Sequence, residues 1–401
     1  MATYPWNFAA WNPERTLAVI SLHGDAPRTN LCGYGGENLE WGRTRNIDGI
    51  PGLMIEGEYE WWEARVNPAL AFRMMYPESC ISFLCDTGRG HFDVAGQTAD
   101  YYCLLFLTKA LEYRLSGHPS LNEPVRLEKL NPEEGWLAER WRPEQKDRAK
   151  AAPYRDYKGD KHDAFWYFDK EMAGLTEARY AKYKGKQMQY LGFMQRGRLV
   201  KYDAGQHAGV IAAFRPEADG LTFHVKGVYT DSLRSSLVKE HAHGGIEVTR
   251  ICGPVAKVND TTFTVRFYRM GMDNPKRTGD IWLLAANEGD SRYKSAVQQF
   301  NIRIPYRNTE GKRQYILFPG IEDVREGVES VSLEAVSDCG LPVYYYVKEG
   351  PAELQDNRLV FTKIPPRSKF PVKVTVVAWQ YGIAGQVQTA EPVERSFFIT
   401  K

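Results

Sequence analysis

The 401-residue chain lacks the sequence features of several large protein classes. It contains no continuous run of about 18 apolar residues, the length that a transmembrane helix needs. Its net charge is only +2, and no basic cluster is interleaved with aromatic residues, so we expect neither a membrane span nor a nucleic-acid partner. Residues 1–13 lack the basic and apolar regions of a signal peptide.

The cysteines also lack a pattern that would indicate a metal site. No C-x-x-C pair or metal-ligand spacing occurs among the six, which stand at positions 32, 80, 85, 103, 252 and 339. Cys80 and Cys85 are five residues apart on one predicted strand, so their side chains point to opposite faces and cannot form a disulfide. We therefore expect free thiols, no metal and no cofactor, and cysteine usage does not indicate a cellular compartment.

Apolar, strand-like segments are present in residues 1–117, where they alternate with helix-like ones. We predict strands at Thr16–Leu22, Gly52–Ile55 and Cys80–Leu84, and a helix at Thr98–Leu115. This alternation is typical of a parallel sheet with both faces covered. The third strand leads into the sequence GRGHFD, in which Gly88 and Gly90 precede His91. A histidine at the carboxyl end of such a strand is a candidate catalytic residue.

The rest of the chain divides into three segments. Residues 118–186 are charged and interrupted by prolines, and we predict a partly helical connecting segment there. From about Gln187 the apolar residues alternate with a period of two, in short runs separated by Gly, Asp and Asn turns. This pattern predicts antiparallel β-sandwiches, which we place at residues 187–310 and 311–401.

Residues 1–117 resemble the last third of an α/β-hydrolase. That family has, in order, a helix, a strand, an acid-bearing strand, a histidine-bearing strand and a closing helix. On this resemblance His91 is the catalytic histidine, Glu60 is the acid, and Glu58 is the next candidate for the acid. The Gly-x-Ser-x-Gly nucleophile elbow, which should precede the first helix, occurs nowhere in the chain.

The resemblance implies acyl transfer in a longer parent protein. A serine outside this chain would attack an ester carbonyl, His91 would act as base and then as acid, and Glu60 would orient the imidazole. The chain would then be an N-terminally truncated hydrolase. Its parallel sheet would expose an open edge, which we expect at Thr16–Leu22.

Residues 311–401 resemble bacterial immunoglobulin-like modules. The resemblance rests on SDCGLPVYYYVKEGPAEL (337–354), LVFT (359–362), KVTVVAWQYG (373–382) and ERSFFI (394–399). Such modules are typical of exported bacterial proteins and often accompany carbohydrate-active domains. The resemblance therefore implies that the parent protein is secreted, periplasmic or on the cell surface. It also implies a polysaccharide or a carbohydrate ester as the partner.

Three glutamates offer an alternative chemistry near the predicted acid. Glu56, Glu58 and Glu60 alternate, so an extended chain would place them on one face at steps of about 7 Å. A pair of carboxylates at such a separation can perform glycoside hydrolysis. A solvated acidic face explains the same pattern.

Other polar groups have a structural explanation beside a functional one. His241 and His243 are a possible metal pair, but they lie in a predicted turn without an evident third ligand. Asp160 and His162 suit a cation or a sugar hydroxyl, or a polar loop. Asp25 follows a predicted strand, where it is a site residue or a turn cap. Core packing and sugar stacking both suit the aromatic residues Trp282, Tyr268 and Tyr229 of the middle sandwich.

We therefore predict a multidomain α/β plus all-β protein, with a partial α/β-hydrolase sheet followed by two antiparallel β-sandwiches. The predicted function is that of a fragment of a secreted bacterial serine hydrolase, an esterase for carbohydrate-linked esters, without its nucleophile. The alternative is a non-catalytic cell-surface or carbohydrate-binding protein that retains a hydrolase remnant.

Overall fold

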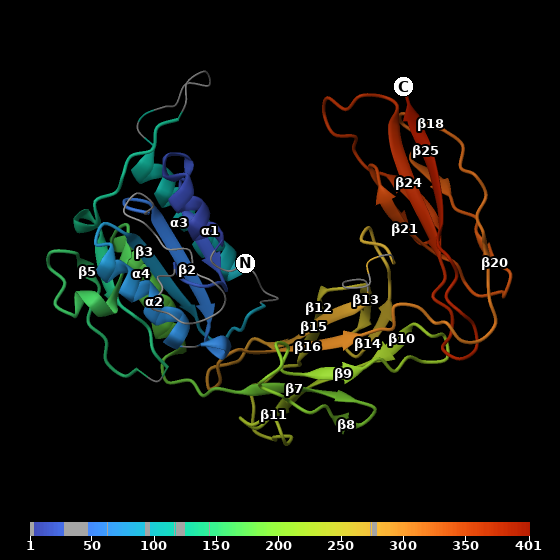
Figure 1. Ribbon diagram of the computed structural model, residues 1–401. Coiled ribbons are helices and arrows are strands. Elements are labelled where there is room, and N and C mark those ends of the chain that lie inside the picture. Colours follow the sequence, from blue (N-terminus) through green and yellow to red (C-terminus); the bar gives the residue numbers. More distant parts are fainter. Residues whose placement is uncertain are drawn as a thin grey trace. The chain divides into compact units, whose positions relative to one another are not determined.

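The computed structural model describes residues 4–401 apart from positions 28–46, 62, 93–96, 116, 118–124, 144, 273 and 275–278. The chain divides into two compact units (Figure 1). Unit 1 comprises Met1–Gln189, His241–Gly244 and Asn287–Val297. Unit 2 comprises Tyr190–Glu240, Gly245–Ala286 and Gln298–Lys401. The division into four domains that the sequence suggests stays a prediction.

Unit 1 contains every α-helix that the described residues form. These are α1 (Tyr4–Trp11), α2 (Glu63–Met75), α3 (Gln97–Arg114) and α4 (Lys170–Tyr183). The short 3-10 helices of this unit are η1 (Pro13–Arg15), η2 (Glu58–Glu60), η3 (Pro132–Glu134) and η4 (Lys161–Asp163). None of the described helices combines the length and the apolar character that crossing a lipid bilayer requires.

A three-stranded parallel sheet carries the candidate site residues of unit 1. Its strands β1 (Val19–Leu22), β2 (Pro51–Gly57) and β3 (Cys80–Asp86) pair in the order β1-β2-β3. Strands β2 and β3 are labelled in Figure 1. Every residue of β2 and β3 is buried, which explains why most of the residues in both strands are apolar. The three strands predicted from the sequence are present, and β1 is an edge strand of this sheet.

A small antiparallel sheet packs beside β3. Its strands are β4 (Trp136–Glu139), β5 (Ala152–Pro153) and β6 (Ala164–Tyr167), in the order β5-β4-β6. The hydroxyls of Ser82 and Tyr167 donate hydrogen bonds between β3 and β6, to Trp166 O and Phe83 O, each at 2.6 Å. The buried residues of both sheets belong to one hydrophobic cluster. The described residues between 125 and 186 thus contribute to the same core as those of the first 117 positions.

Unit 2 is built from strands in mostly antiparallel sheets. In the region around Tyr190–Arg303 they are β7 (Tyr190–Gln195), β8 (Arg198–Leu199), β9 (Ile211–Ala213), β10 (Thr222–His224), β11 (Lys226–Thr230), β12 (Glu247–Cys252), β13 (Val255–Asn259), β14 (Thr262–Val265), β15 (Asp280–Asn287) and β16 (Ala296–Arg303). They form the sheets β11-β7-β8, β12-β15-β16-β9 and β10-β14-β13. Phe193 of β7 and Phe300 of β16 pack with ring centroids 4.5 Å apart, which joins the first two sheets.

The C-terminal strands form a second sandwich with its own core. They are β17 (Ile316–Leu317), β18 (Val324–Arg325), β19 (Ser330–Ser332), β20 (Val336–Ser337), β21 (Tyr344–Glu349), β22 (Ala352–Gln355), β23 (Arg358–Phe361), β24 (Val372–Trp379) and β25 (Val393–Thr400). The sheets β18-β25-β24-β21 and β19-β23-β22 contribute side chains to one hydrophobic cluster. Phe361 and Phe397 meet edge to face across it.

The predicted fold class is wrong in its α/β part. The described residues form 25 strands and only four α-helices, so the chain is mainly β. The apolar pattern of residues 1–117 correctly predicted the parallel strands β1 to β3. The further prediction that these strands belong to part of an α/β-hydrolase sheet was wrong. The strands that lie beside β3 are instead short and antiparallel, and they bury the same apolar side chains.

Candidate functional site

The ends of the three parallel strands bring two imidazoles and one carboxylate together. His23 directly follows β1, Glu60 ends η2 after β2, and His91 follows β3 by a short loop. The carboxyl ends of parallel strands lie at one edge of a sheet, where functional residues of such sheets gather. The structure therefore brings the predicted pair His91 and Glu60 together and adds His23 to it.

Glu60 is shared between the two histidines. Its Oε1 lies 2.6 Å from His23 Nδ1, and its Oε2 lies 2.8 Å from His91 Nδ1. The ring centroids of the histidines are 5.8 Å apart. The side chain of His91 is 26% exposed, against 8% for that of His23, so solvent reaches His91 more easily.

Hydrogen bonding keeps the Glu60 carboxylate charged. Burial alone would raise the pKa of Glu60, but the hydrogen bonds and the charges of His23 and His91 outweigh burial and hold that pKa well below its usual range. An ionised carboxylate can only accept hydrogen bonds. Each imidazole must therefore present an Nδ1–H group to Glu60, so that any proton uptake by these rings takes place at Nε2.

Three further ionisable groups belong to the surroundings of this carboxylate. Arg65 Nη1 lies 3.3 Å from Glu60 Oε2, and Arg65 Nε lies 3.8 Å from Asp25 Oδ1. Glu56 of β2 is fully buried, and neither of its carboxyl oxygens has a hydrogen-bond partner. Burial raises the pKa of Glu56 to about 9, with Arg65 opposing and with Glu60 and Asp25 adding to the rise. Glu56 is therefore a neutral acid at pH 7.

A metal ion is the alternative occupant of such a group of side chains. Among the described residues, His23, Glu60 and His91 form the one group whose ligand atoms lie within 4.8 Å of one another. Two ligand atoms of a tetrahedral zinc ion, each about 2.1 Å from the metal, lie about 3.4 Å apart. The nitrogen–oxygen distances of 2.6 and 2.8 Å are shorter, and they match hydrogen bonds that share a proton.

Glu58, the second predicted acid, does not bond His91 but has other hydrogen-bond partners. Its side chain is 2% exposed and bonds Lys294 Nζ at 2.5 Å. Its other oxygen accepts a hydrogen bond from Gly88 N at 2.8 Å. The alternation of Glu56, Glu58 and Glu60 on one extended face does not occur either, because β2 ends at Gly57 and a 3-10 helix follows.

The other polar groups singled out in the sequence make hydrogen bonds outside the group of His23, Glu60 and His91. Asp160 Oδ1 caps η4 by accepting from His162 N, and His243 N donates to Asp290 Oδ2. Asp25 contributes its backbone oxygen to the Trp6 indole at 2.8 Å. Asp160 makes its contact through its side chain, whereas His243 and Asp25 use backbone atoms, so these two contacts do not test the predicted roles of their side chains.

The aromatic residues of the middle sandwich differ in exposure. Tyr229 is buried, whereas Tyr268 is half-buried under the guanidinium of Arg250, 5.0 Å from its ring centroid. Trp282 lies with its ring centroid 5.6 Å from that of His207. A polysaccharide partner stays a prediction, since none of these contacts tests it.

Sequence reasoning missed His23 and Arg65. The segment LHGDAP follows a predicted strand, and the argument that selected His91 at a strand end applies to His23 in the same way. Its φ of 47° places it in the left-handed region, which is uncommon for a residue other than glycine. Arg65 lies on α2, and no sequence pattern links it to Glu60.

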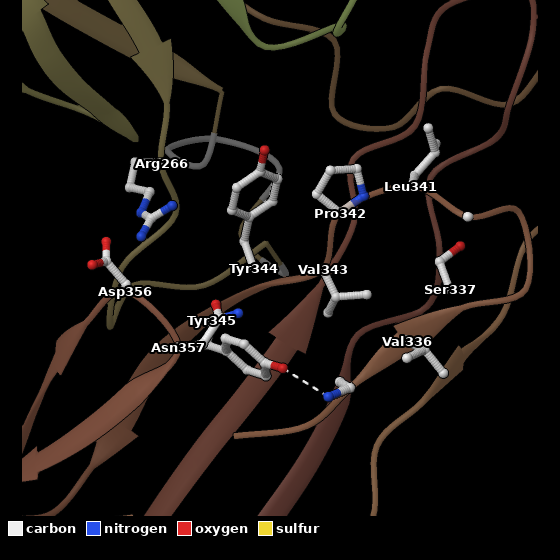
Figure 2. A pocket seen from close by; sticks show the side chains of 12 residues that line it. Arg266, Val336, Ser337, Leu341, Pro342, Val343, Tyr344, Tyr345, Asp356 and Asn357 are labelled. Carbon is white, nitrogen blue, oxygen red and sulfur yellow. Dashed lines mark hydrogen bonds between the residues drawn. The ribbon is translucent and has the colours of Figure 1, made fainter. Parts of the chain in front are cut away.

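Unit 2 contains a hollow of about 510 Å³ that is separate from these residues (Figure 2). Arg266 lies with its guanidinium 5.3 Å from the centroid of the Tyr344 ring. Tyr345 accepts a hydrogen bond from Ala335 N at 2.8 Å. We place the candidate site in unit 1, where His23, Glu60 and His91 meet.

Comparison with known proteins assigns no family. No family model matches the chain, and no curated protein matches it. A human protocadherin-24 EC1-2 structure is 11% identical, covers 50% of this chain and 97% of its own, and has a TM-score of 0.19. Mouse cadherin-23 EC22-24 is 17% identical over 53% and 63%, with a TM-score of 0.17. Drosophila N-cadherin EC1-3 is 12% identical over 69% and 82%, with a TM-score of 0.18.

These findings overturn the predicted families and functions. No family model and no curated protein supports an α/β-hydrolase or an immunoglobulin-like module in this chain, and the solved structures named above are cadherin extracellular domains. In the described part of unit 1 the parallel sheet has three strands, and a hydrolase sheet is not present. The predicted esterase fragment is therefore wrong, and so is the alternative of a surface or carbohydrate-binding protein with a hydrolase remnant. At these TM-scores the cadherin matches assign no function themselves.

Proposed function

We propose that unit 1 carries a general acid–base centre, in which His91 exchanges a proton with a bound small molecule while Glu60 orients its imidazole. The observation that carries this proposal is the pair of hydrogen bonds from two Nδ1 atoms to one carboxylate, at 2.6 and 2.8 Å. A base that is oriented in this way can accelerate proton transfer by about 10²- to 10⁴-fold.

The roles of the three residues follow from their contacts and exposure. His91 is the proton acceptor and donor, because its ring is the more exposed of the two. Glu60 fixes the tautomer of His91 and stabilises the imidazolium that forms on proton uptake. His23 bonds the second oxygen of Glu60, so that the carboxylate stays in the orientation that His91 needs.

The proposed tautomer is tested by nitrogen-15 NMR of the histidine rings at pH 9, where an ordinary imidazole is neutral. We expect Nδ1–H tautomers for His23 and His91. In the Glu60→Gln variant the new side chain has one acceptor oxygen and one amide group. It can accept from only one imidazole, so at least one ring must change its tautomer. Unchanged nitrogen signals in this variant would contradict the proposed pairing.

The proposed chemistry is tested with 5-nitrobenzisoxazole, whose ring opening reports a catalytic base. The base takes the proton from the ring carbon, the electron pair of that bond forms the nitrile, and the nitrogen–oxygen bond breaks to leave a coloured phenolate. No other reactant is needed. We expect the His91→Ala variant to lose about 10²-fold or more of the rate.

A histidine outside the site provides the matched control. His162 is 71% exposed and bonds only local groups of η4 in the described contacts. The His162→Ala variant should keep the rate of the unmodified protein. Equal rates in His91→Ala and in the unmodified protein would overturn the acid–base proposal.

We infer further that the protein acts outside the cytoplasm. Unit 2 consists of strands in successive β-sandwiches, an architecture that many cell-surface domains share. Cell fractionation followed by detection with an antibody against the chain tests this location. Recovery in the cytoplasmic fraction alone would contradict it.

A further inference from the structure

The loops that carry Glu60 and His91 are joined to one another directly. Tyr59 N donates a hydrogen bond to Arg89 O at 2.9 Å. A Cβ atom at Gly57 would lie only 2.6 Å from Gly90 O, so the two backbones are in close contact. The relative position of the two proposed site residues therefore depends on how these loops are held together.

The buried side chain of Glu58 also links the same two loops. It precedes Glu60 by two residues, and its Oε2 accepts a hydrogen bond from Gly88 N, three residues before His91, at 2.8 Å. Its Oε1 lies 2.5 Å from Lys294 Nζ. The side chains of Glu58 and Lys294 are 2% and 13% exposed, so water screens this ion pair only weakly.

Lys294 belongs to the segment Asn287–Val297, which joins β15 to β16 and is part of unit 1. The segment contacts both loops at further points. Ser295 Oγ donates to Gly88 O at 3.1 Å, and Tyr59 Oη lies 3.2 Å from Ser295 O. Arg89, which is buried, makes a two-pronged ion pair with Glu288 at 3.2 and 2.9 Å.

We infer that the segment Asn287–Val297 positions the proposed acid–base pair, and that Glu58 and Lys294 are positioning residues for His91 and Glu60. This inference rests on the proposed function and deepens it. The segment bonds both loops, so it fixes the distance between them. Displacement of reacting groups by about 1 Å is enough to reduce a rate about 10²-fold.

Loss of the Glu58–Lys294 ion pair should displace the loop that carries His91. Removal of Lys294 leaves a buried carboxylate with a single remaining hydrogen bond, from Gly88 N. A buried charge without its partner is strongly unfavourable. Glu58 would then move toward water and pull Gly88 with it, which would displace the loop of His91.

The experiment compares Lys294→Met with Lys294→Arg, which keeps the charge. Lys294→Met should lower the rate with saturating 5-nitrobenzisoxazole about tenfold or more and should change the nitrogen-15 tautomer signal of His91. Lys294→Arg should restore most of both. The thermal unfolding temperature is measured in parallel, because a role in stability alone would lower this temperature without altering the tautomer signal.

Two additional variants keep the test interpretable. Lys373→Met removes a lysine from an exposed ion pair with Glu349, whose atoms lie 2.6 Å apart with side chains about half exposed. This variant should leave the rate and the tautomer unchanged. If Lys294→Met does not fold, the double variant Glu58→Gln/Lys294→Met removes both charges and permits the same measurements.

The outcomes separate this inference from the proposed function. A rate that depends on His91 but is the same in Lys294→Met and in the unmodified protein overturns the positioning role alone. A rate that does not depend on His91 overturns the proposed function. In that case a changed His91 tautomer in Lys294→Met still supports the positioning role, and an unchanged tautomer overturns it.

Discussion

Gly57 lies so close to the backbone of Gly90 that there is no room for a side chain at position 57. A Cβ atom on Gly57 would approach Gly90 O to 2.6 Å and Arg89 O to 2.7 Å. Both atoms belong to the backbone, so no rotation of a side chain can relieve the contact. The φ of Gly57 is −76°, a value that every residue adopts. Glycine is therefore required here by space and not by backbone conformation.

The Gly57→Ala substitution should separate the loops of Glu60 and His91. We expect the unfolding free energy of unit 1 to fall by about 1–3 kcal/mol, as for other substitutions that overpack a closed site. The ring opening of 5-nitrobenzisoxazole should slow in the same variant. Chemical denaturation and the rate assay measure the two effects.

Gly174 offers a control within the same unit. It lies inside α4, and a Cβ atom there would meet no other atom within 4 Å. Gly174→Ala should raise the unfolding free energy by about 0.5–1 kcal/mol, because alanine favours a helix interior more than glycine does. Equal effects of the two substitutions would show that the contact between Gly57 and Gly90 is not as close as described.

Glu56 should make the protein less stable as the pH rises. Burial raises the pKa of Glu56 to about 9, whereas an unfolded glutamate has a pKa of about 4.3. Between these values the unfolded chain has released the proton and the folded chain still holds it. The unfolding free energy contributed by this group therefore falls from about pH 4.3 up to about pH 9 and is constant above.

The Glu56→Gln variant tests this dependence, because it keeps the shape of the side chain and removes its titration. Its unfolding free energy should exceed that of the unmodified protein at pH 8, and the difference should grow between pH 5 and pH 8. Urea denaturation at several pH values measures it. Two parallel curves would mean that Glu56 is not a buried neutral acid.

Local patterns predicted the elements that carry the candidate site. The largely apolar segments Gly52–Ile55 and Cys80–Leu84 correspond to buried strands β2 and β3. The pairing of His91 with Glu60 was implied by the resemblance to a hydrolase, and the structure places the two side chains within hydrogen-bond distance at the ends of adjacent parallel strands. Their catalytic role stays a proposal.

The parts that the sequence could not predict depend on contacts between distant segments. Glu58 and Lys294 are 236 residues apart, and no periodicity relates them. The fold class failed for the same reason, because β4 to β6 complete the core of the parallel sheet from a segment whose prolines and charges suggested a linker. Short apolar strands specify burial, but they do not specify which strands lie beside them.

The thiols should differ sharply in reactivity. Burial raises the pKa of Cys85 and of Cys80 well above the usual range, and the thiolate is the reactive form. Cys252 is exposed. Alkylation of the folded protein followed by peptide mass spectrometry should label Cys252 first and should label the two buried thiols only after unfolding. Early labelling of Cys85 would contradict the burial of β3.

Glu60 should respond to pH in the opposite direction to Glu56, although the two carboxyl groups belong to the same site. The pKa of Glu60 is held below its usual range by His23 and His91 in spite of burial. Its contribution to stability is therefore present above about pH 4.3, the unfolded value, and is lost as the pH falls toward the lower folded value. Denaturation between pH 2.5 and pH 6 should show the unmodified protein losing stability relative to Glu60→Gln on acidification. A constant difference would mean that the carboxylate is not stabilised by the two imidazoles, and the acid–base proposal would lose its physical basis.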